Sequence, residues 1–147
     1  MFYWDVWCPK SGLFHHGAKY PLELAYKLAE TKSNPELVTA ILENADPKSY
    51  IEASKPLTGN LRPIHLAACF GYVQAARTMI HNSTPVNLKD EYDRTPIFFA
   101  AHNGHYNMVQ ELLGFSANPN ICSINGITPI HWAAKNGHVE IVQLLMP

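Results

Sequence analysis

The sequence lacks an excess of either charge and any long apolar run. Its 147 residues carry 11 Lys and Arg against 12 Asp and Glu, for a formal net charge of −1. This balance argues against a surface dedicated to nucleic acid or to anionic membranes, because both kinds of binding depend on a positive excess. No uninterrupted apolar run approaches the roughly 18 residues of a membrane-spanning helix. We therefore expect neither nucleic-acid binding nor membrane insertion.

Cysteine is also scarce. Cys8, Cys69 and Cys122 are odd in number, lie far apart and form no C-x-x-C pair. A disulfide framework is not expected, and a reducing compartment fits better. The apolar start of the chain lacks a basic segment and contains Asp5, so it does not resemble a signal peptide. We expect a cytoplasmic protein, with the nucleus as an alternative.

What the sequence does contain is internal repetition. An apolar content of 47% and a length of 147 residues indicate one folded domain. Within it, three copies of a short motif are spaced by 33 residues and keep a Pro, an Ala pair and a Gly in phase. The copies begin Arg62-Pro-Ile-His-Leu-Ala-Ala, Thr95-Pro-Ile-Phe-Phe-Ala-Ala and Thr128-Pro-Ile-His-Trp-Ala-Ala.

A fainter copy precedes these three. Tyr20-Pro-Leu-Glu-Leu-Ala25 matches the opening, and the segment 36–47 matches the second half. About four extra residues lie between these halves, where Asn34-Pro35 marks a break. The connector 48–60 to the next copy is also longer than the later connectors.

Each copy predicts two short helices. Thr before Pro is a favoured helix start, since Thr is a good N-cap and Pro is tolerated at the first helical position. A Gly about eight residues later ends the helix in the left-handed conformation. The second helices are predicted over 73–80, 106–113 and 139–146, with an apolar stripe on one side. Helices this short are stable only when units bury their faces on one another.

These residues resemble the ankyrin repeat, whose opening is T-P-L-H-x-A-A and whose period is 33. The resemblance implies an all-α solenoid of stacked helix-turn-helix units with projecting β-turn fingers. The units are predicted at about 20–47, 59–87, 92–120 and 125–147, as one domain over 20–147. Residues 1–19 form an aromatic lead-in, expected either to cap the first unit as a short hairpin or to dock a partner.

The resemblance also implies structural roles for four of the eight histidines. His65 and His131 occupy the position that bonds the backbone and the Thr of the same motif, and His105 and His138 follow the helix-ending Gly. Phe98 replaces this His in the third copy, so that unit should lack the bond. Arg62 replaces the Thr in the second copy, which leaves its N-cap open to question.

The sequence predicts no cofactor, no metal and no catalysis. His65 and Cys69 are spaced to share a helix face, but two ligands are too few for zinc, and no third group or oxyanion site supports a nucleophile. Cys8 with His15 and His16 is a metal cluster by composition alone, and a plain loop is the simpler interpretation.

By resemblance, recognition is carried by variable positions on the finger tips and at the ends of the first helices. The predicted partner-binding residues are Leu61, Cys69, Phe70, Lys89, Glu91, Tyr92, Arg94, His102, Asn103, Ile124, Asn125, Ile127, Lys135 and Asn136. The physical case is best for Tyr92, Arg94 and Phe70, because aromatic residues and Arg are common at interface hot spots. The alternative is that the two finger residues are simply solvated and that Phe70 packs on a neighbouring unit. Trp132 is expected in the core.

We therefore expect a non-enzymatic scaffold or adaptor that binds a protein partner on its concave face. The apolar run 141–146 has no polar cap after it, so further repeats or domains of the same polypeptide beyond Pro147 are also expected. The alternative is a regulatory or targeting portion of a larger enzyme or channel. Ligand or nucleic-acid binding on the concave face and a Cys-based enzyme are weaker alternatives.

Overall fold

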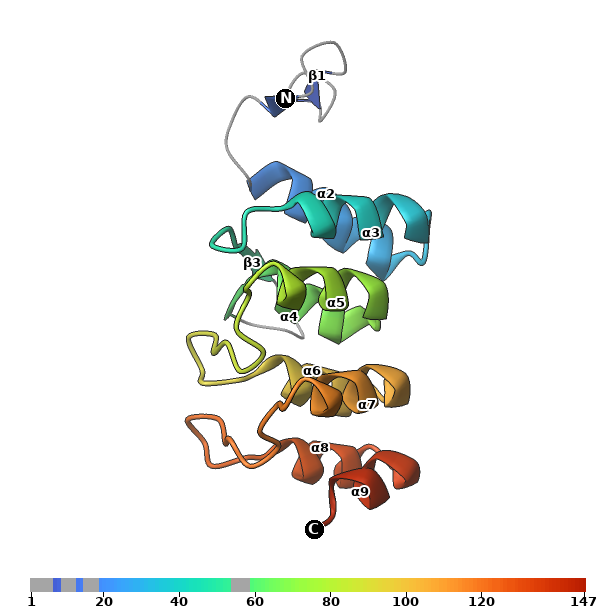
Figure 1. Ribbon diagram of the computed structural model, residues 1–147, viewed down its shortest axis with the longest axis vertical. Helices are drawn as coiled ribbons and strands as arrows, with labels where there is room; N and C mark the ends of the chain where they lie inside the picture. The colour runs from blue at the N-terminus through green and yellow to red at the C-terminus, as the bar shows by residue number, and fades with distance from the viewer. Residues whose placement is uncertain (1–6, 9–12, 15–18, 54–58) are drawn as a thin grey trace.

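The fold is a stack of antiparallel helix pairs, each lying on the next along one axis (Figure 1). A computed structural model describes residues 7–8, 13–14, 19–53 and 59–147. From the N-terminus the pairs are α2 (Lys19–Glu30) with α3 (Pro35–Asn44), α4 (Pro63–Phe70) with α5 (Val73–His81), α6 (Pro96–His102) with α7 (Tyr106–Gly114), and α8 (Pro129–Lys135) with α9 (Val139–Leu145). The loops between pairs project to one side, as the predicted fingers do (Figure 1). The all-α solenoid is confirmed.

Two short hairpins accompany the helices. β1 (Trp7–Cys8) pairs antiparallel with β2 (Leu13–Phe14), so the hairpin considered for the lead-in is present. Whether it caps the first unit or docks a partner lies outside the described residues. β3 (Ile51–Ala53) pairs antiparallel with β4 (Gly59–Leu61) in the long connector. The sequence did not predict this second hairpin, because nothing in the connector alternates clearly.

The break in the first unit lies where the sequence placed it. Asn34 adopts a left-handed conformation with φ 44° and caps α3, since its Oδ1 accepts the Leu37 N–H at 3.1 Å. Pro35 is the first residue of α3. The α2 helix is 12 residues long, whereas α4, α6 and α8 have 8, 7 and 7 residues. The first unit therefore reaches the same helix-pair architecture through a longer inner helix and an Asn cap.

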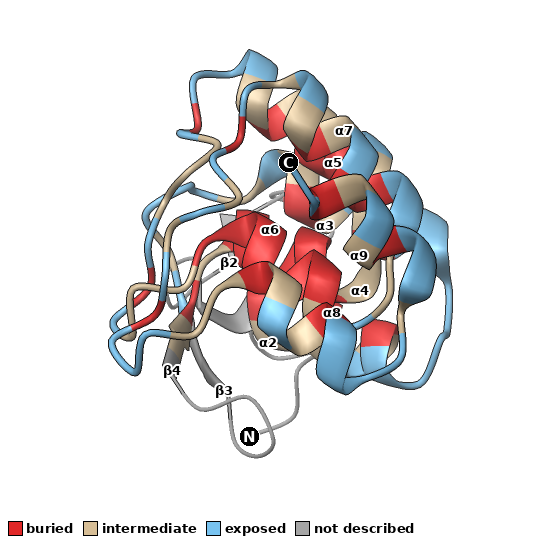
Figure 2. Ribbon diagram, turned by 90° about the horizontal axis from the view of Figure 1, so that it is seen from below, coloured by how far each residue is buried: buried red, intermediate tan, exposed pale blue. Residues whose placement is uncertain are grey.

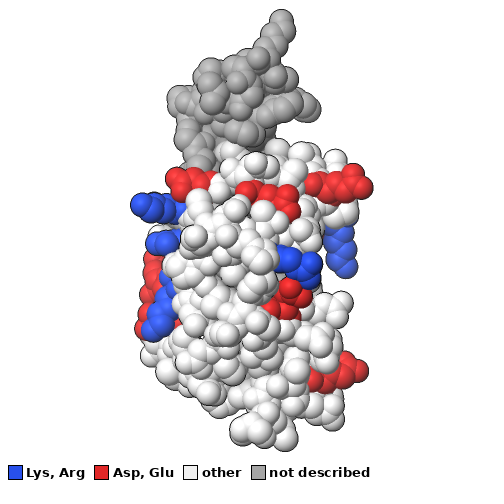
Figure 3. Space-filling model, in the orientation of Figure 1, with Lys and Arg blue, Asp and Glu red and all other residues white. Residues whose placement is uncertain are grey.

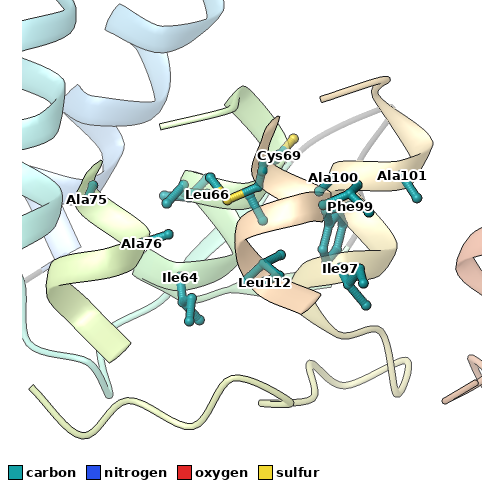
Figure 4. Close-up of a cluster of buried hydrophobic side chains, with 14 of the residues drawn as sticks. Ile64, Leu66, Cys69, Ala75, Ala76, Ile97, Phe99, Ala100, Ala101 and Leu112 are labelled. Carbon is teal, nitrogen blue, oxygen red and sulfur yellow. The ribbon is translucent and has the colours of Figure 1, made fainter. Parts of the chain in front are cut away.

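The core is continuous through the stack, because the inner helices α4 and α6 are buried between their neighbours (Figure 2). Ala67, Ala100 and Ala133 are each 0% exposed, and their small side chains let adjacent helices approach closely. Larger side chains fill the rest of the core: Phe99 of α6 packs edge to face on His65 of α4 with ring centroids 5.6 Å apart, and Leu112 of α7 is buried in the same cluster (Figure 4). Burial between units therefore stabilises helices that are too short to be stable alone.

Glycines at the ends of the inner helices allow close contact between units. Gly71 and Gly104 have φ of 78° and 77°, a conformation that L side chains rarely adopt. A Cβ on Gly71 would lie 2.8 Å from Nδ1 of His105, and one on Gly104 would lie 2.6 Å from Cε1 of His138. Each imidazole thus lies against the bare backbone of the preceding unit.

The prediction that Thr hydroxyls cap the inner helices is wrong for Thr95. Its Oγ1 is buried and has no hydrogen-bond partner among the described residues. In the fourth unit, Thr128 Oγ1 instead lies 3.0 Å from His131 Nδ1, which also accepts the Thr128 N–H at 3.0 Å. Phe98 replaces that His in the third unit, so the loss expected from the sequence is confirmed. In the second unit, Arg62 makes no side-chain cap, but its N–H donates to His65 Nδ1 at 3.3 Å.

The helices in the described part of the chain are all too short or too polar to cross a membrane.

Candidate functional site

The third finger, the loop 88–95 that leads into α6, is organised by one buried carboxylate, that of Asp90. Asp90 is 7% exposed, and its Oδ1 accepts the N–H groups of Tyr92 and Arg94 at 3.0 and 2.8 Å. Its Oδ2 accepts a hydrogen bond from Arg94 Nε–H at 2.7 Å and lies 2.6 Å from Arg94 Nη2 in an ion pair. The Arg94 guanidinium also lies over the rings of Tyr92 and Phe99, at 5.0 and 4.8 Å from their centroids. The buried charge is therefore paired and hydrogen-bonded, as burial of a carboxylate requires.

This arrangement changes the interpretation of Arg94. The Arg94 side chain is only 13% exposed, so it is not a simply solvated residue. Its contacts with Asp90 stabilise the finger. Tyr92 is partly exposed beside it, and Lys89 and Glu91 are exposed on the same finger. Lys89 Nζ lies 3.9 Å from Asp93 Oδ1, a solvent-exposed pair that contributes little to stability. Asp90 was not identified from the sequence as the residue that organises the finger.

The fourth finger, the loop 121–128 that leads into α8, lies directly beside the third finger. The Ile124 N–H donates to the Tyr92 carbonyl at 3.0 Å, which joins the two finger tips. The Ile124 side chain is 59% exposed, and Asn125 and Gly126 next to it are exposed as well. Ile127 is partly buried, and its carbonyl accepts the Ser123 N–H at 2.9 Å. Tyr92 and Ile124 thus offer apolar surface at the rim of the concave face.

The ends of the inner helices form the second part of this face. His102 and Trp132 stack edge to face with centroids 4.6 Å apart, and Lys135 Nζ lies 4.6 Å from the centroid of the Trp132 ring. Asn136 donates through Nδ2 to the His102 carbonyl at 2.8 Å, and Asn103 likewise bonds the Phe99 carbonyl at 3.0 Å. Asn103, Lys135 and Asn136 are exposed. The expectation that Trp132 belongs to the core is not met, because the residue is only partly buried among the described residues.

Three other predicted contact residues turn inward. Leu61 is 0% exposed and Cys69 is 4% exposed, so neither reaches a partner on the surface, and both predictions are corrected. Asn103 Nδ2 approaches Cys69 Sγ at 3.4 Å and covers it. Phe70 packs edge to face on Tyr26 with centroids 5.7 Å apart, which is the alternative interpretation of that residue. Sequence variability at a repeat position therefore does not establish exposure.

The repeat histidines join units rather than line a reaction site. His65 Nε2 lies 2.8 Å from the Leu88 carbonyl, and His105 Nε2 lies 2.8 Å from the Cys69 carbonyl. His138 Nε2 lies 3.2 Å from the His102 carbonyl. Burial lowers the pKa of His65 to about 4, despite the bond to Leu88 and the charge of Asp90. Burial also lowers the pKa of His105. Neutral imidazoles that bond backbone carbonyls across a unit boundary are structural groups.

The same burial leaves Cys69 poorly suited to nucleophilic chemistry. It raises the pKa of the thiol to about 12, whereas reactive cysteines have a lowered pKa. Among the described residues, no group of three or more His, Cys, Asp or Glu side chains is placed to hold a metal ion. The side chains of Cys8, His15 and His16, the cluster suggested by composition, lie outside the described residues.

On the face seen in Figure 3, the charges of the described residues do not mark out a surface for nucleic acid. On the face shown in Figure 3, blue and red side chains of the described residues alternate, and no broad basic patch forms. Arg77 Nε lies 2.8 Å from Glu111 Oε1 across the boundary between α5 and α7. Thr78 Oγ1 donates to Glu43 Oε1 at 3.1 Å across the previous boundary. Polar pairs on this face connect the outer helices to one another.

Stacked helix pairs, fingers on one side and histidine bonds between units define a helical repeat solenoid. The family model for ankyrin repeats matches residues 25–121 and 64–147, with 3 copies. The chain belongs to the ankyrin-repeat family. Members of this family are generally protein–protein interaction modules and are typically non-catalytic. No curated protein matches the chain.

Proposed function

We propose that the protein is a scaffold or adaptor that binds a protein partner on its concave face. The observation that carries this proposal is the joined finger tips. They hold exposed Ile124 and partly exposed Tyr92, and the inner helices that follow these fingers end in the exposed residues Asn103, Lys135 and Asn136. Apolar and aromatic groups with polar groups around them are typical of the centre and rim of protein interfaces.

Two further proposals concern the lack of catalytic activity and the cellular compartment of the chain. We propose that the chain has no catalytic activity of its own, because burial keeps the Cys69 thiol protonated and a thiol is a far weaker nucleophile than a thiolate. We also propose a reducing compartment, the cytoplasm or the nucleus. Support comes from Cys69 and Cys122, which are free thiols, one buried and the other exposed.

A direct test compares two sets of surface substitutions. The concave set is Ile124→Arg, Asn125→Arg and Lys135→Glu, all at exposed positions. The matched control set is Gln74→Arg, Gln110→Arg and Gln143→Glu, at exposed positions of α5, α7 and α9. Partners of the wild-type protein are captured by cross-linking in cells and identified by mass spectrometry. We expect the concave set to lose them and the control set to keep them.

The folding of both triple variants is checked by circular dichroism and thermal unfolding. If the folded concave variant still captures every partner that the wild type captures, the concave face is not the binding site. If the control set loses the partners instead, the outer helices carry the binding.

We also propose that the outer face of the last unit packs on further protein, either more repeats or another domain. Ala134 is exposed, whereas its equivalents Ala68 and Ala101 are each 0% exposed beneath the next unit. The same contrast separates exposed His131 from His65. Amide hydrogen exchange in α8 and α9 is compared between this chain alone and the assembled protein. If the face is covered, exchange in these two helices is slower in the assembly. Unchanged exchange would show that the face stays open.

A further inference from the structure

The chain contains three Asn-Gly pairs, and the fold treats them differently. They are Asn103-Gly104, Asn125-Gly126 and Asn136-Gly137. Asparagine is chemically labile, and Gly as the next residue offers least hindrance to attack on the side-chain amide. The local sequence is therefore equally permissive at all three pairs, and any difference in lability comes from tertiary structure.

Two of the three side chains are anchored to the neighbouring helix end. Asn103 Nδ2 donates to the Phe99 carbonyl at 3.0 Å and approaches Cys69 Sγ at 3.4 Å. Asn136 Nδ2 donates to the His102 carbonyl at 2.8 Å. Both residues also close an inner helix, since their backbone N–H groups bond the Phe99 and Trp132 carbonyls at 3.1 and 3.0 Å. Rotating either amide toward the following nitrogen breaks these bonds.

Asn125 has no such restraint. It is exposed at the tip of the fourth finger, and its side chain makes no hydrogen bond with the residues that the structure describes. A Cβ on Gly126 would meet nothing within 4 Å, so the space around the pair is open. The Gly126 N–H bonds the Ser123 carbonyl at 2.8 Å, which is shorter than the bonds of Gly104 and Gly137 to carbonyls, at 3.4 and 3.2 Å. The free side chain of Asn125, and not a freer backbone nitrogen, therefore sets this pair apart.

We propose that Asn125 is a site of spontaneous deamidation in the folded protein, whereas Asn103 and Asn136 are protected by their contacts with the neighbouring unit. The Gly126 nitrogen loses its proton and attacks the Asn125 side-chain carbonyl carbon. A new C–N bond forms, the bond to the amide nitrogen breaks, and ammonia leaves with a five-membered imide behind. Water then opens either carbonyl of the imide, which gives Asp or isoaspartate without any change of oxidation state.

The product changes the finger in two ways. Either acid adds a negative charge, so the formal net charge moves from −1 to −2. Isoaspartate also inserts a methylene group into the backbone between Ile124 and Gly126, inside the turn closed by the Ser123–Gly126 and Ser123–Ile127 bonds. The modification does not depend on the proposed function, but any effect on partner binding does, because it requires the concave face to be the binding surface.

The test uses the whole protein, with the three sites as internal controls for one another. Folded protein is incubated in mildly alkaline buffer at physiological temperature, and peptides are analysed over time by mass spectrometry for Asp and isoaspartate. The expected result is conversion at position 125 several-fold faster than at 103 or 136. In a second sample unfolded in urea, the three sites are expected to convert at similar rates.

An Asn125→Gln variant, with one more methylene that disfavours the cyclic imide, should remove the acidic species that ion exchange separates from the wild type. Equal conversion at all three sites in the folded protein would overturn the proposal, as would an unmodified position 125. Binding of the deamidated protein to a captured partner is measured separately. A modified finger with unchanged binding contradicts the concave-face assignment and leaves the modification itself established.

Discussion

The second and fourth units read almost alike in sequence but differ in how much of each is covered. Every residue from Pro63 to Cys69 is buried in the second unit, whereas Pro129 and Ala133 are the buried residues of α8 in the fourth. His65 is 0% exposed and bonds Leu88 of the next finger, while His131 is exposed and bonds only its own unit in the described part of the chain. The motif therefore determines the backbone of a unit, and the neighbouring unit determines its burial and its energetics.

The largest effect should come from the glycines that end the inner helices. Gly104→Ala combines a strained φ with a Cβ 2.6 Å from the His138 ring, so we expect a loss of about 3 kcal/mol in unfolding free energy. Gly137→Ala has nearly the same φ of 76° but open space around it, so only about 1 kcal/mol should be lost. Urea unfolding followed by circular dichroism measures both. Equal losses would show that contact between units does not distinguish the glycines.

The next effect concerns pH. Because burial lowers the folded-state pKa of His65 to about 4 from an ordinary value of 6.5, the unfolded chain binds protons first as pH falls. Stability is therefore full above pH 6.5 and declines between 6.5 and about 4, by on the order of 3 kcal/mol from this group. His105 shifts in the same direction and adds to the decline.

Unfolding free energies measured across this pH window check the prediction. A His65→Gln variant should be less stable at neutral pH and should show a shallower decline on acidification. The His131→Gln variant, at the exposed counterpart, is the matched control. If His65→Gln keeps the full wild-type slope, the buried imidazole is not the group responsible.

The smallest effect separates the two Thr residues that open the third and fourth units. Thr95→Val removes a buried hydroxyl without a partner among the described residues, so stability should be unchanged or higher by up to about 1 kcal/mol. Thr128→Val removes the bond to His131 and should cost about 0.5–1 kcal/mol. Thermal unfolding of the two variants should shift the midpoint in opposite directions or move only that of Thr128→Val. A clear loss in Thr95→Val would indicate that its hydroxyl has a partner after all.

Much of the fold could be predicted from the sequence, because local chemistry repeats with the period. The three later Pro residues begin inner helices, the Gly residues after them have positive φ, and the outer helices begin at Val73, Tyr106 and Val139 as predicted. The outer-helix stripe is also confirmed at Met108, Val109 and Leu112. These features depend on residues close together in the chain.

The candidate site was harder to predict, because it depends on neighbours distant in sequence. Leu61 and Cys69 occupy positions that are variable by resemblance, yet adjacent helices bury them. Phe70 packs on Tyr26 of the first unit. The sequence match of that unit to the repeat is faint, so this particular contact was not predictable. Trp132 has the repeat position of buried Phe99 but is only partly buried among the described residues. The unit boundaries at about 20–47, 59–87, 92–120 and 125–147 stay a prediction.

The contacts that Asp90 makes within the third finger affect how a partner binds there. Since three hydrogen bonds and an ion pair to Asp90 already immobilise the third finger, a ligand that binds there gains contacts without first having to order a loop. Little conformational entropy is left to lose at that point, so complexes formed there should dissociate slowly for their contact area, and their association should be limited by mutual orientation rather than by refolding of the loop.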